Sequence, residues 1–286
     1  MRVLITGSSG FLGDEITRQL RSAGHDTLGV DLRQGSHTDQ VGDLADRALV
    51  RALVGQADAV VHTASLHAPH VGVRSRQDFV ATNVLGALHV LEAAAEAGVR
   101  RLVYTSTTSV YGEALVPIDA RAVWVTEDVV PRPRDIYDIT KLAAEQLCRD
   151  VARDGGLSVL CLRTGRFFPE PPNITAVHRL SRGADVRDIA AAHLLALDAP
   201  TDLHYETFNI AARSPFTEAD LPALLDDAAP VVQHAFPLAA EVFARRGWAL
   251  PHRIDRVYVI QKAERVLGYR PRYNFGELLR ELQAGA

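Results

Sequence analysis

The chain has 286 residues, of which 47% are hydrophobic, and a net charge of −4 at pH 7. A chain of this length and composition can bury the core of one domain, or of one domain with a small appendage, as an ordinary soluble enzyme does. Because the charge is mildly negative and no basic cluster is present, neither nucleic acid nor an anionic membrane is expected as a partner.

No segment of the sequence is typical of a secretory signal or a membrane span. Met1 leads directly into a predicted core strand, and there is no stretch of about 18 or more apolar residues. We therefore expect a cytoplasmic protein. Cys148 and Cys161 fall in a predicted helix and a predicted buried strand, where they are expected to act as small apolar side chains rather than as a disulfide.

Strands and helices alternate along the chain. Strands are expected near residues 1–6, 26–31, 58–62, 100–105, 157–162 and 205–210, and helices near 11–24, 44–54, 77–97, 136–153 and 187–198. This alternation predicts an α/β fold, a Rossmann-type doubly wound parallel sheet with helices on both faces. Ligands of such sheets bind at the carboxyl ends of the strands, where the polar motifs of this chain are found.

A glycine-rich turn joins the first strand to the first helix. The glycines are spaced G-x-x-G-x-x-G, and the turn ends in Gly10-Phe11-Leu12-Gly13 after Gly7. Glycines at these positions allow a tight turn and a close approach of the backbone to a pyrophosphate, and the following helix offers free N–H groups. We therefore expect Gly7, Gly10, Phe11, Leu12 and Gly13 to bind a dinucleotide.

The second predicted strand ends in Asp31, about 20 positions beyond the glycine turn. A carboxylate at this position can accept hydrogen bonds from the adenosine ribose and would repel a 2′-phosphate. NAD is therefore favoured over NADP as the cofactor. Arg33 is the counter-argument, because an arginine there can pair with such a phosphate.

Tyr137 and Lys141 form a pair on the predicted helix 136–153. Residues i and i+4 lie on one face of a helix, so the phenol and the ammonium can meet. A neighbouring cation favours the phenolate, and we expect it to lower the pKa of Tyr137 from about 10 toward neutrality. Such a group can exchange protons with a substrate.

Seven motifs in order make the chain similar to the extended short-chain dehydrogenases/reductases, and in particular to the NAD-dependent epimerase/dehydratase family. The similarity covers roughly residues 1–210 and returns at Gln261 to Tyr273. The motifs are Gly7-x-x-Gly10-x-x-Gly13, Gly42-Asp43-Leu44, His62-Thr63-Ala64-Ser65, Asn83-Val84-x-Gly86, Thr105-Ser106-Thr107-Thr108-Ser109-Val110-Tyr111-Gly112, Tyr137-x-x-x-Lys141 and Leu162-Arg163.

The resemblance implies a set of further cofactor residues. Asp43 would contact the adenine, and Lys141 would hold the nicotinamide ribose. For Asn83, a hydrogen bond that only shapes the site is as good an interpretation as a direct role. The full set that it adds to the glycine turn and Asp31 is Asp43, Leu44, Thr63, Ala64, Asn83, Thr105, Tyr137 and Lys141.

The resemblance also implies the catalytic residues Thr107, Tyr137 and Lys141. The Thr107 hydroxyl would bind a substrate oxygen while Tyr137 removes or returns its proton, and NAD would exchange hydride with the same carbon. Thr108-Ser109 stands where 4,6-dehydratases have an Asp-Glu pair, so dehydration is disfavoured.

The segment between Arg163 and Asp188 is short, about 24 residues. This length resembles that of smaller family members such as the uronate dehydrogenases, which oxidise free sugars, and is too short to enclose a nucleotide sugar. Candidate substrate residues are Ser65, Thr107, Thr108, Arg179 and Arg182, and the two arginines are suited to a carboxylate or phosphate. The spacing of His62, His67 and His70 matches no compact zinc pattern, so no metal is expected.

Three functions are compatible with these residues. The first is an NAD-dependent oxidoreductase that acts on a secondary alcohol or carbonyl of a sugar-like small molecule. The second is an NAD-dependent sugar or nucleotide-sugar epimerase in which NAD stays bound. The third is a non-catalytic dinucleotide sensor, which has no need of the three catalytic residues together.

The expected organisation is an NAD-binding Rossmann domain of residues 1–163 plus 185–212 and a small substrate-capping region of residues 164–184 plus 213–286. Short helices are expected in the cap near 216–225, 238–246, 261–267 and 275–282. A homodimer is also expected, because apolar side chains on the helices 77–97 and 136–153 can form an intersubunit seam or simply cover the sheet. They are Leu85, Leu88, Leu91, Leu142, Leu147 and Val151.

Overall fold

The computed structural model describes residues 1–200 and 202–284. Within these residues the main feature is a seven-stranded sheet with the strand order β3-β2-β1-β4-β5-β7-β8. The pairings of β1 with β2 and β4, of β2 with β3 and of β4 with β5 are parallel, which confirms the predicted fold class. The strands are β1 (Arg2–Thr6), β2 (Asp26–Asp31), β3 (Gln40–Val41), β4 (Ala59–His62), β5 (Arg101–Thr107), β7 (Ser158–Thr164) and β8 (Tyr205–Ile210).

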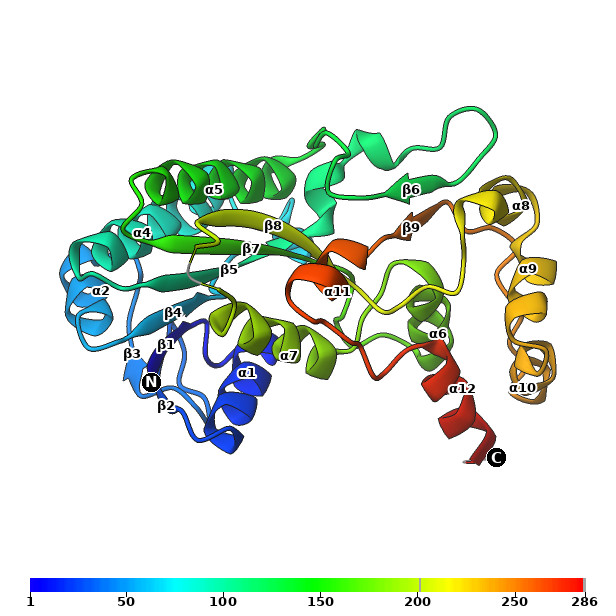
Figure 1. Ribbon diagram of the computed structural model, residues 1–286, viewed down its shortest axis with the longest axis horizontal. Helices are drawn as coiled ribbons and strands as arrows, with labels where there is room; N and C mark the ends of the chain where they lie inside the picture. Colours follow the sequence, from blue (N-terminus) through cyan, green and yellow to red (C-terminus); the bar gives the residue numbers. More distant parts are fainter. Residues whose placement is uncertain (201, 285–286) are drawn as a thin grey trace. The chain divides into compact units, whose positions relative to one another are not determined.

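Helices cover both faces of this sheet (Figure 1). One face carries α2 (Arg47–Val54), α4 (Gly86–Glu96) and α5 (Ile136–Arg153), and the other carries α1 (Phe11–Ser22) and α7 (Val186–Leu197). Because both faces are buried, the strands are continuous apolar runs rather than alternating ones. In β1, for example, the side chains of Val3, Leu4 and Ile5 are all buried.

The predicted helix over residues 77–97 is interrupted. The helix α3 (Arg76–Phe79) leads into a π-helical segment, Val80–Leu85, and α4 follows it. A π segment widens the helical turn by one residue, and within it Asn83 directs its side chain to the backbone of Leu66. The apolar periodicity does not predict this segment, because the pattern of buried positions continues through it.

The chain falls into two compact units. The first comprises Met1–Val110, Pro133–Arg163 and Ala190–Phe208, and the second comprises Tyr111–Arg132, Thr164–Ile189 and Asn209–Ala286. Residue 201 of the predicted Rossmann domain and residues 285–286 of the predicted cap lie outside the described residues.

The second unit has its own small sheet and core. Its strands β6 (Val123–Val125) and β9 (Arg256–Tyr258) pair in parallel, and its core includes Phe216, Leu221, Phe243, Val257 and Phe275. Its helices are α6 (Pro172–Ser181), α8 (Leu221–Asp226), α9 (Ala228–Ala235), α10 (Ala239–Arg245), α11 (Gln261–Val266) and α12 (Phe275–Ala284).

Four of these helices, α8, α10, α11 and α12, were expected from the sequence, whereas α6 and α9 were not. The segment before α6 is rich in proline and therefore indicates a loop. However, Pro171 and Pro172 lie at the start of α6, where a proline is favoured because its missing N–H would have no helical partner.

Cys148 and Cys161 are buried and not joined in a disulfide, as predicted. Among the described helices, none is long and apolar enough to cross a membrane. In residues 1–200 and 202–284, no group of three or more His, Cys, Asp or Glu side chains is arranged to hold a metal ion.

Candidate active site

The glycine-rich turn between β1 and α1 is shaped by contacts that exclude side chains. Gly7 has a φ of +76°, and a Cβ there would lie 2.7 Å from Thr63 Oγ1 and 2.8 Å from the Ala64 nitrogen. A Cβ at Gly13 would lie 2.1 Å from the Gly7 carbonyl oxygen. The turn before α1 therefore lacks side chains at its glycine positions. Among the described residues, no side chain caps α1 at Gly10. An uncapped helix start of this kind suits a phosphate anion.

Asp31, at the end of β2, is tied to the same turn. Its Oδ2 accepts the Ser9 N–H at 3.1 Å, and its Oδ1 accepts the Arg33 N–H at 3.0 Å. Each carboxylate oxygen can accept a further hydrogen bond. The Ser9 Oγ is buried and has no hydrogen-bond partner among the described residues. The turn and Asp31 thus offer donors for a pyrophosphate, acceptors for a ribose and an unused hydroxyl, which fits NAD.

Several of the other predicted cofactor residues lie at the ends of neighbouring strands or in the first turn of α1. Phe11 and Leu12 are the first two residues of α1. The Thr63 hydroxyl donates to the Thr6 carbonyl at 2.7 Å, which fixes the chain that leaves β4. Asp43 is exposed, and its Oδ1 accepts the N–H of the residue two positions on at 2.9 Å.

Thr107 and Tyr137 meet through their side chains. Thr107 ends β5 and Tyr137 lies in the first turn of α5, and the Thr107 hydroxyl is close enough to the phenol to affect its pKa. Both residues are 8% exposed. The first turn of α5 is fixed by Asp135, whose Oδ1 accepts the N–H groups of Tyr137 at 2.9 Å and Asp138 at 3.0 Å. This cap sets the position of the phenol.

Lys141 lies one turn further along α5 and is buried. Its Nζ donates to the Thr105 carbonyl oxygen at 2.6 Å and lies 4.3 Å from the centre of the Tyr104 ring. Burial lowers the pKa of Lys141 to about 8, against the charge of Glu145, which raises it. The ammonium is therefore charged at pH 7 and directed toward β5.

The predicted lowering of the Tyr137 pKa is wrong for this structure. Burial raises the pKa of Tyr137 to about 12, and the charges of Asp138 and Asp135 add to the rise, while the hydrogen bond from Thr107 opposes it. The cost of placing a phenolate in a buried position exceeds the help of its neighbours. Tyr137 is therefore protonated at neutral pH and arranged as a proton donor.

Asn83 makes internal hydrogen bonds. Its Nδ2 donates to the Leu66 carbonyl at 3.0 Å and to Thr140 Oγ1 at 3.1 Å, and its Oδ1 accepts the Leu66 N–H at 2.7 Å. Asn83 thus fastens the loop that follows β4 to α5. These contacts support the interpretation in which Asn83 shapes the site.

A buried network next to Lys141 was not predicted. Glu145 follows Lys141 by one helical turn, and its Oε1 accepts from Ser106 Oγ at 2.5 Å and from Arg163 Nε at 3.0 Å. The second guanidinium nitrogen of Arg163 donates to Glu145 Oε2 at 2.7 Å. His193 Nε2 lies 2.8 Å from Thr105 Oγ1. The spacing of Glu145 four residues after Lys141 is the one sequence signal that indicates part of this network.

The predicted substrate residues differ in their surroundings. Ser65 Oγ lies 3.4 Å from His67 Nδ1, and Thr108 is buried. Arg179 is also buried, pairs with Asp185 Oδ2 at 2.7 Å and donates to the Tyr273 carbonyl. These structural contacts occupy the guanidinium of Arg179.

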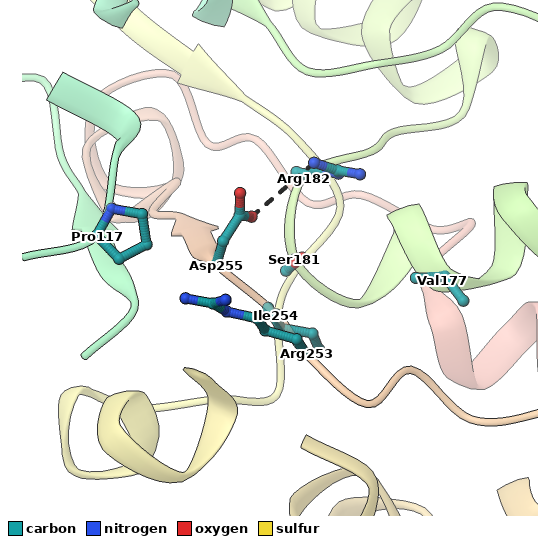
Figure 2. A pocket seen from close by; sticks show the side chains of 7 residues that line it. All are labelled: Pro117, Val177, Ser181, Arg182, Arg253, Ile254 and Asp255. Atoms are coloured by element: carbon teal, nitrogen blue, oxygen red, sulfur yellow. Dashed lines mark ion pairs between the residues drawn. The ribbon is translucent and has the colours of Figure 1, made fainter. Parts of the chain in front are cut away.

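Arg182, by contrast, lines a cavity of about 410 Å³ inside the second unit. Figure 2 shows the side chains that line this cavity, among them Arg253. A dashed line marks the ion pair between Arg182 and Asp255. Two guanidinium groups and one carboxylate face this space, so the cavity is suited to an anionic ligand. The other lining residues are Pro117, Val177, Ser181 and Ile254.

The sequence of this chain is similar to those of known proteins. Residues 3–180 match the model of the NAD dependent epimerase/dehydratase family. The dTDP-glucose 4,6-dehydratase of Streptomyces antibioticus is 30% identical over 315 residues, 97% of this chain and 90% of that protein. The uronate dehydrogenase of Pseudomonas syringae pv. tomato is 30% identical over 180 residues, 60% of this chain and 62% of its own length.

A solved structure, MoeE5 in complex with UDP-glucose and NAD, has a TM-score of 0.72 and 26% identity and covers 100% of this chain and 99% of its own. In the first curated relatives that it matches, the chain spans about three fifths of their length. The fold and site define a nucleotide-binding α/β protein of the short-chain dehydrogenase/reductase type. The chain belongs to the NAD-dependent epimerase/dehydratase family, and its cofactor is NAD.

Proposed function

We propose that the chain is an NAD-dependent oxidoreductase that acts on a secondary alcohol or carbonyl of a sugar-like small molecule. The observation that supports this proposal is the proximity of the Thr107 hydroxyl to the Tyr137 phenol, with Lys141 buried one turn further along the same helix. Burying polar and charged side chains costs free energy, and buried groups with shifted pKa values are typical of functional sites.

When bound, NAD would supply the hydride acceptor or donor. In the proposed mechanism Thr107 donates a hydrogen bond to the substrate oxygen and holds it at Tyr137. Because Tyr137 is protonated at neutral pH in this structure, it can donate its proton when a carbonyl is reduced. In the reverse direction, the phenolate that this transfer leaves would take up the proton of the alcohol. Lys141 would hold the nicotinamide ribose.

The proposed cofactor site consists of the glycine turn and Asp31. Gly7, Gly10 and Gly13 would admit the pyrophosphate to the start of α1, and Asp31 would accept hydrogen bonds from the ribose hydroxyls. The negative charge of Asp31 supports NAD over NADP. Arg33 donates its backbone N–H to Asp31, but its side chain is exposed.

The proposed substrate is a carbohydrate, and the cavity at Arg182 and Arg253 would bind an anionic part of it. A uronate dehydrogenase among the relatives supports a sugar acid. The second candidate function is an epimerase of nucleotide sugars, which the similarity to a protein solved with UDP-glucose supports. Thr108-Ser109 in place of an Asp-Glu pair argues against dehydration, and a sensor would have no use for the catalytic residues.

We further propose a homodimer that is built through the π segment and α5. Leu85 is 47% and Ile139 49% exposed, which is unusual for large apolar side chains on adjacent helices. Leu91, by contrast, is 1% exposed and packs against the sheet. Sedimentation of the wild-type protein and of a Leu85→Glu, Ile139→Glu variant tests this proposal; a wild-type monomer contradicts it.

The test of the proposed function is a substrate panel. The purified protein is mixed with NAD and uronic acids, aldoses or nucleotide sugars, and the absorbance of reduced nicotinamide is followed. Stoichiometric reduced cofactor with a uronic acid or an aldose supports the oxidoreductase. Isomerised nucleotide sugar without free reduced cofactor supports the epimerase and overturns the first proposal.

A further inference from the structure

A series of hydrogen-bonded side chains leads from Glu170 through His178 to Arg182, which lines the cavity. We propose that His178, on α6, is a positioning residue that fixes the direction of the Arg182 guanidinium, so that Arg182 presents its free N–H groups to an anionic group of the substrate. This inference rests on the proposed function, which assigns the cavity to an anionic part of the substrate.

The backbone at Arg182 is held from both sides. The His178 carbonyl accepts the N–H groups of Arg182 at 2.9 Å and Gly183 at 2.6 Å, which closes the end of α6. The Arg182 carbonyl accepts the Arg166 N–H at 3.0 Å, and the Arg166 carbonyl accepts the Ala184 N–H at 2.9 Å. A Cβ at Gly183 would lie 2.9 Å from His178 Cβ. Because these contacts fix the backbone of Arg182, only its side-chain torsion angles remain free to change.

The Arg182 side chain is directed by His178. The NH2 nitrogen of Arg182 lies 3.0 Å from His178 Nε2. A guanidinium can only donate, so Nε2 is the acceptor and the imidazole proton lies on Nδ1. That proton is donated to Glu170 Oε2 at 2.7 Å, and Arg166 Nε donates to the other oxygen of Glu170 at 2.7 Å. Each member of this chain fixes the next one.

The hydrogen bonds among Arg182, His178 and Glu170 require a neutral imidazole and a charged carboxylate, and the surroundings of these side chains favour both states. Burial lowers the pKa of His178, and the charge of Arg182 lowers it further, against the charge of Glu170. Burial raises the pKa of Glu170, but the hydrogen bond from Arg166, the charge of Arg166 and the hydrogen bond from His178 lower it below its ordinary value. At neutral pH the imidazole is therefore neutral and the carboxylate charged.

The opposite side of Arg182 is held only loosely. Its NH1 nitrogen lies 3.9 Å from Asp255 Oδ1, which is too long for a hydrogen bond. Asp255 has a closer partner in Arg256, whose Nε donates to it at 3.0 Å. Arg182 thus has one firm contact, to His178, and remains 38% exposed at the cavity that it shares with Arg253 (Figure 2). A guanidinium whose direction is fixed in advance loses less entropy when it binds an anion.

Three substitutions of His178 separate its two hydrogen bonds. The amide oxygen of His178→Gln reaches the position of Nε2 and can accept from Arg182, whereas the amide of His178→Asn reaches only the position of Nδ1. His178→Phe retains an aromatic ring but cannot form either hydrogen bond, to Glu170 or from Arg182. We expect the Asn and Phe variants to raise KM for an anionic sugar substrate about 2- to 10-fold, and the Gln variant to restore it, with the effect on KM rather than kcat.

Binding is measured by calorimetry with two probes, glucuronate and UDP-glucuronic acid, and NAD binding serves as the control for folding. Equal affinities in the wild type and in the His178→Asn and His178→Phe variants overturn the inference, as does a loss in His178→Gln equal to that in His178→Phe. A wild-type protein that binds neither probe also overturns it.

Arg182→Ala distinguishes this inference from the proposed function. If it weakens binding of the probes while the His178 variants do not, the cavity binds the anion but His178 does not position Arg182. If Arg182→Ala leaves binding unchanged, the anionic role of the cavity and the inference are both overturned. The catalytic assignment is tested separately, through Tyr137.

Discussion

At the scale of single residues, the proposed chemistry depends on the proximity of the Thr107 hydroxyl to the Tyr137 phenol. Tyr137→Phe removes the hydroxyl that the proposed mechanism assigns to proton transfer and changes little else, because the ring can stay in its buried position. Turnover should fall by a factor of about 10²–10⁴, while NAD binding, measured by fluorescence titration, should stay close to that of the wild type. A variant that retains full turnover would show that another group donates the proton.

Asp31 should determine the choice of cofactor. Asp31→Asn retains an acceptor for the glycine turn but removes the negative charge, so NAD should bind about tenfold more weakly, as expected for a lost charge-assisted hydrogen bond. NADP should bind as well as before or better, because the repulsion of the 2′-phosphate is gone. Titration of both cofactors checks this, and an equal loss of both would contradict the ribose assignment.

The glycine motif could be predicted because part of its requirement is local. The φ of +76° at Gly7 and the close approach of Gly13 to the Gly7 carbonyl both arise within the turn itself. The pKa of Tyr137 could not be predicted, because burial of the phenol raises it and burial is a property of the folded protein. Arg179 illustrates the same limit, since its partner Asp185 occupies the guanidinium.

At the scale of secondary structure, α5 brings Tyr137 and Lys141 to the end of β5. Asp135→Ala removes the carboxylate that accepts the N–H groups of Tyr137 and Asp138. The free energy of unfolding should fall by about 1 kcal/mol, and kcat should also fall because this turn holds the phenol. Denaturant unfolding and steady-state kinetics measure the two effects.

A matched control for this change is available at another helix. Asp46 caps α2 in the same way, with its Oδ1 accepting the N–H groups of Ala48 at 3.0 Å and Leu49 at 3.1 Å. Asp46→Ala should lower stability by a similar amount and leave kcat unchanged. Equal losses of kcat in both variants would indicate a general effect of stability and not a role for the α5 cap.

The elements that could be predicted are those with a continuous apolar run or a helical period of buried side chains. The strands of the sheet have the first pattern, and α5 has the second. The π segment around Asn83 could not be predicted, because the helical pattern continues through it and hydrogen bonds to Leu66 and Thr140 shape it. The buried pair of Glu145 and Arg163 joins positions 18 residues apart, and only the folded sheet brings them together.

At the scale of the whole molecule, stability should decrease in acid in part because buried imidazoles must become charged. Burial lowers the pKa of His67 from 6.5 to about 4, and the charges of Lys141 and His70 add to this. The unfolded chain therefore binds a proton that the folded protein does not, from about pH 6.5 downward. The stability that neutral His67 contributes is complete above pH 6.5 and is lost as the pH falls toward 4.

His67→Gln removes this titrating group. Between pH 7 and pH 5 the variant should lose about 1–2 kcal/mol less of its free energy of unfolding than the wild type does. Urea unfolding at the two pH values measures the difference, and His204→Gln, at an exposed histidine, should follow the wild type. If His67→Gln loses as much stability as the wild type, His67 does not contribute to the acid sensitivity, and the half-buried position of its imidazole beside Tyr137 is not maintained in solution.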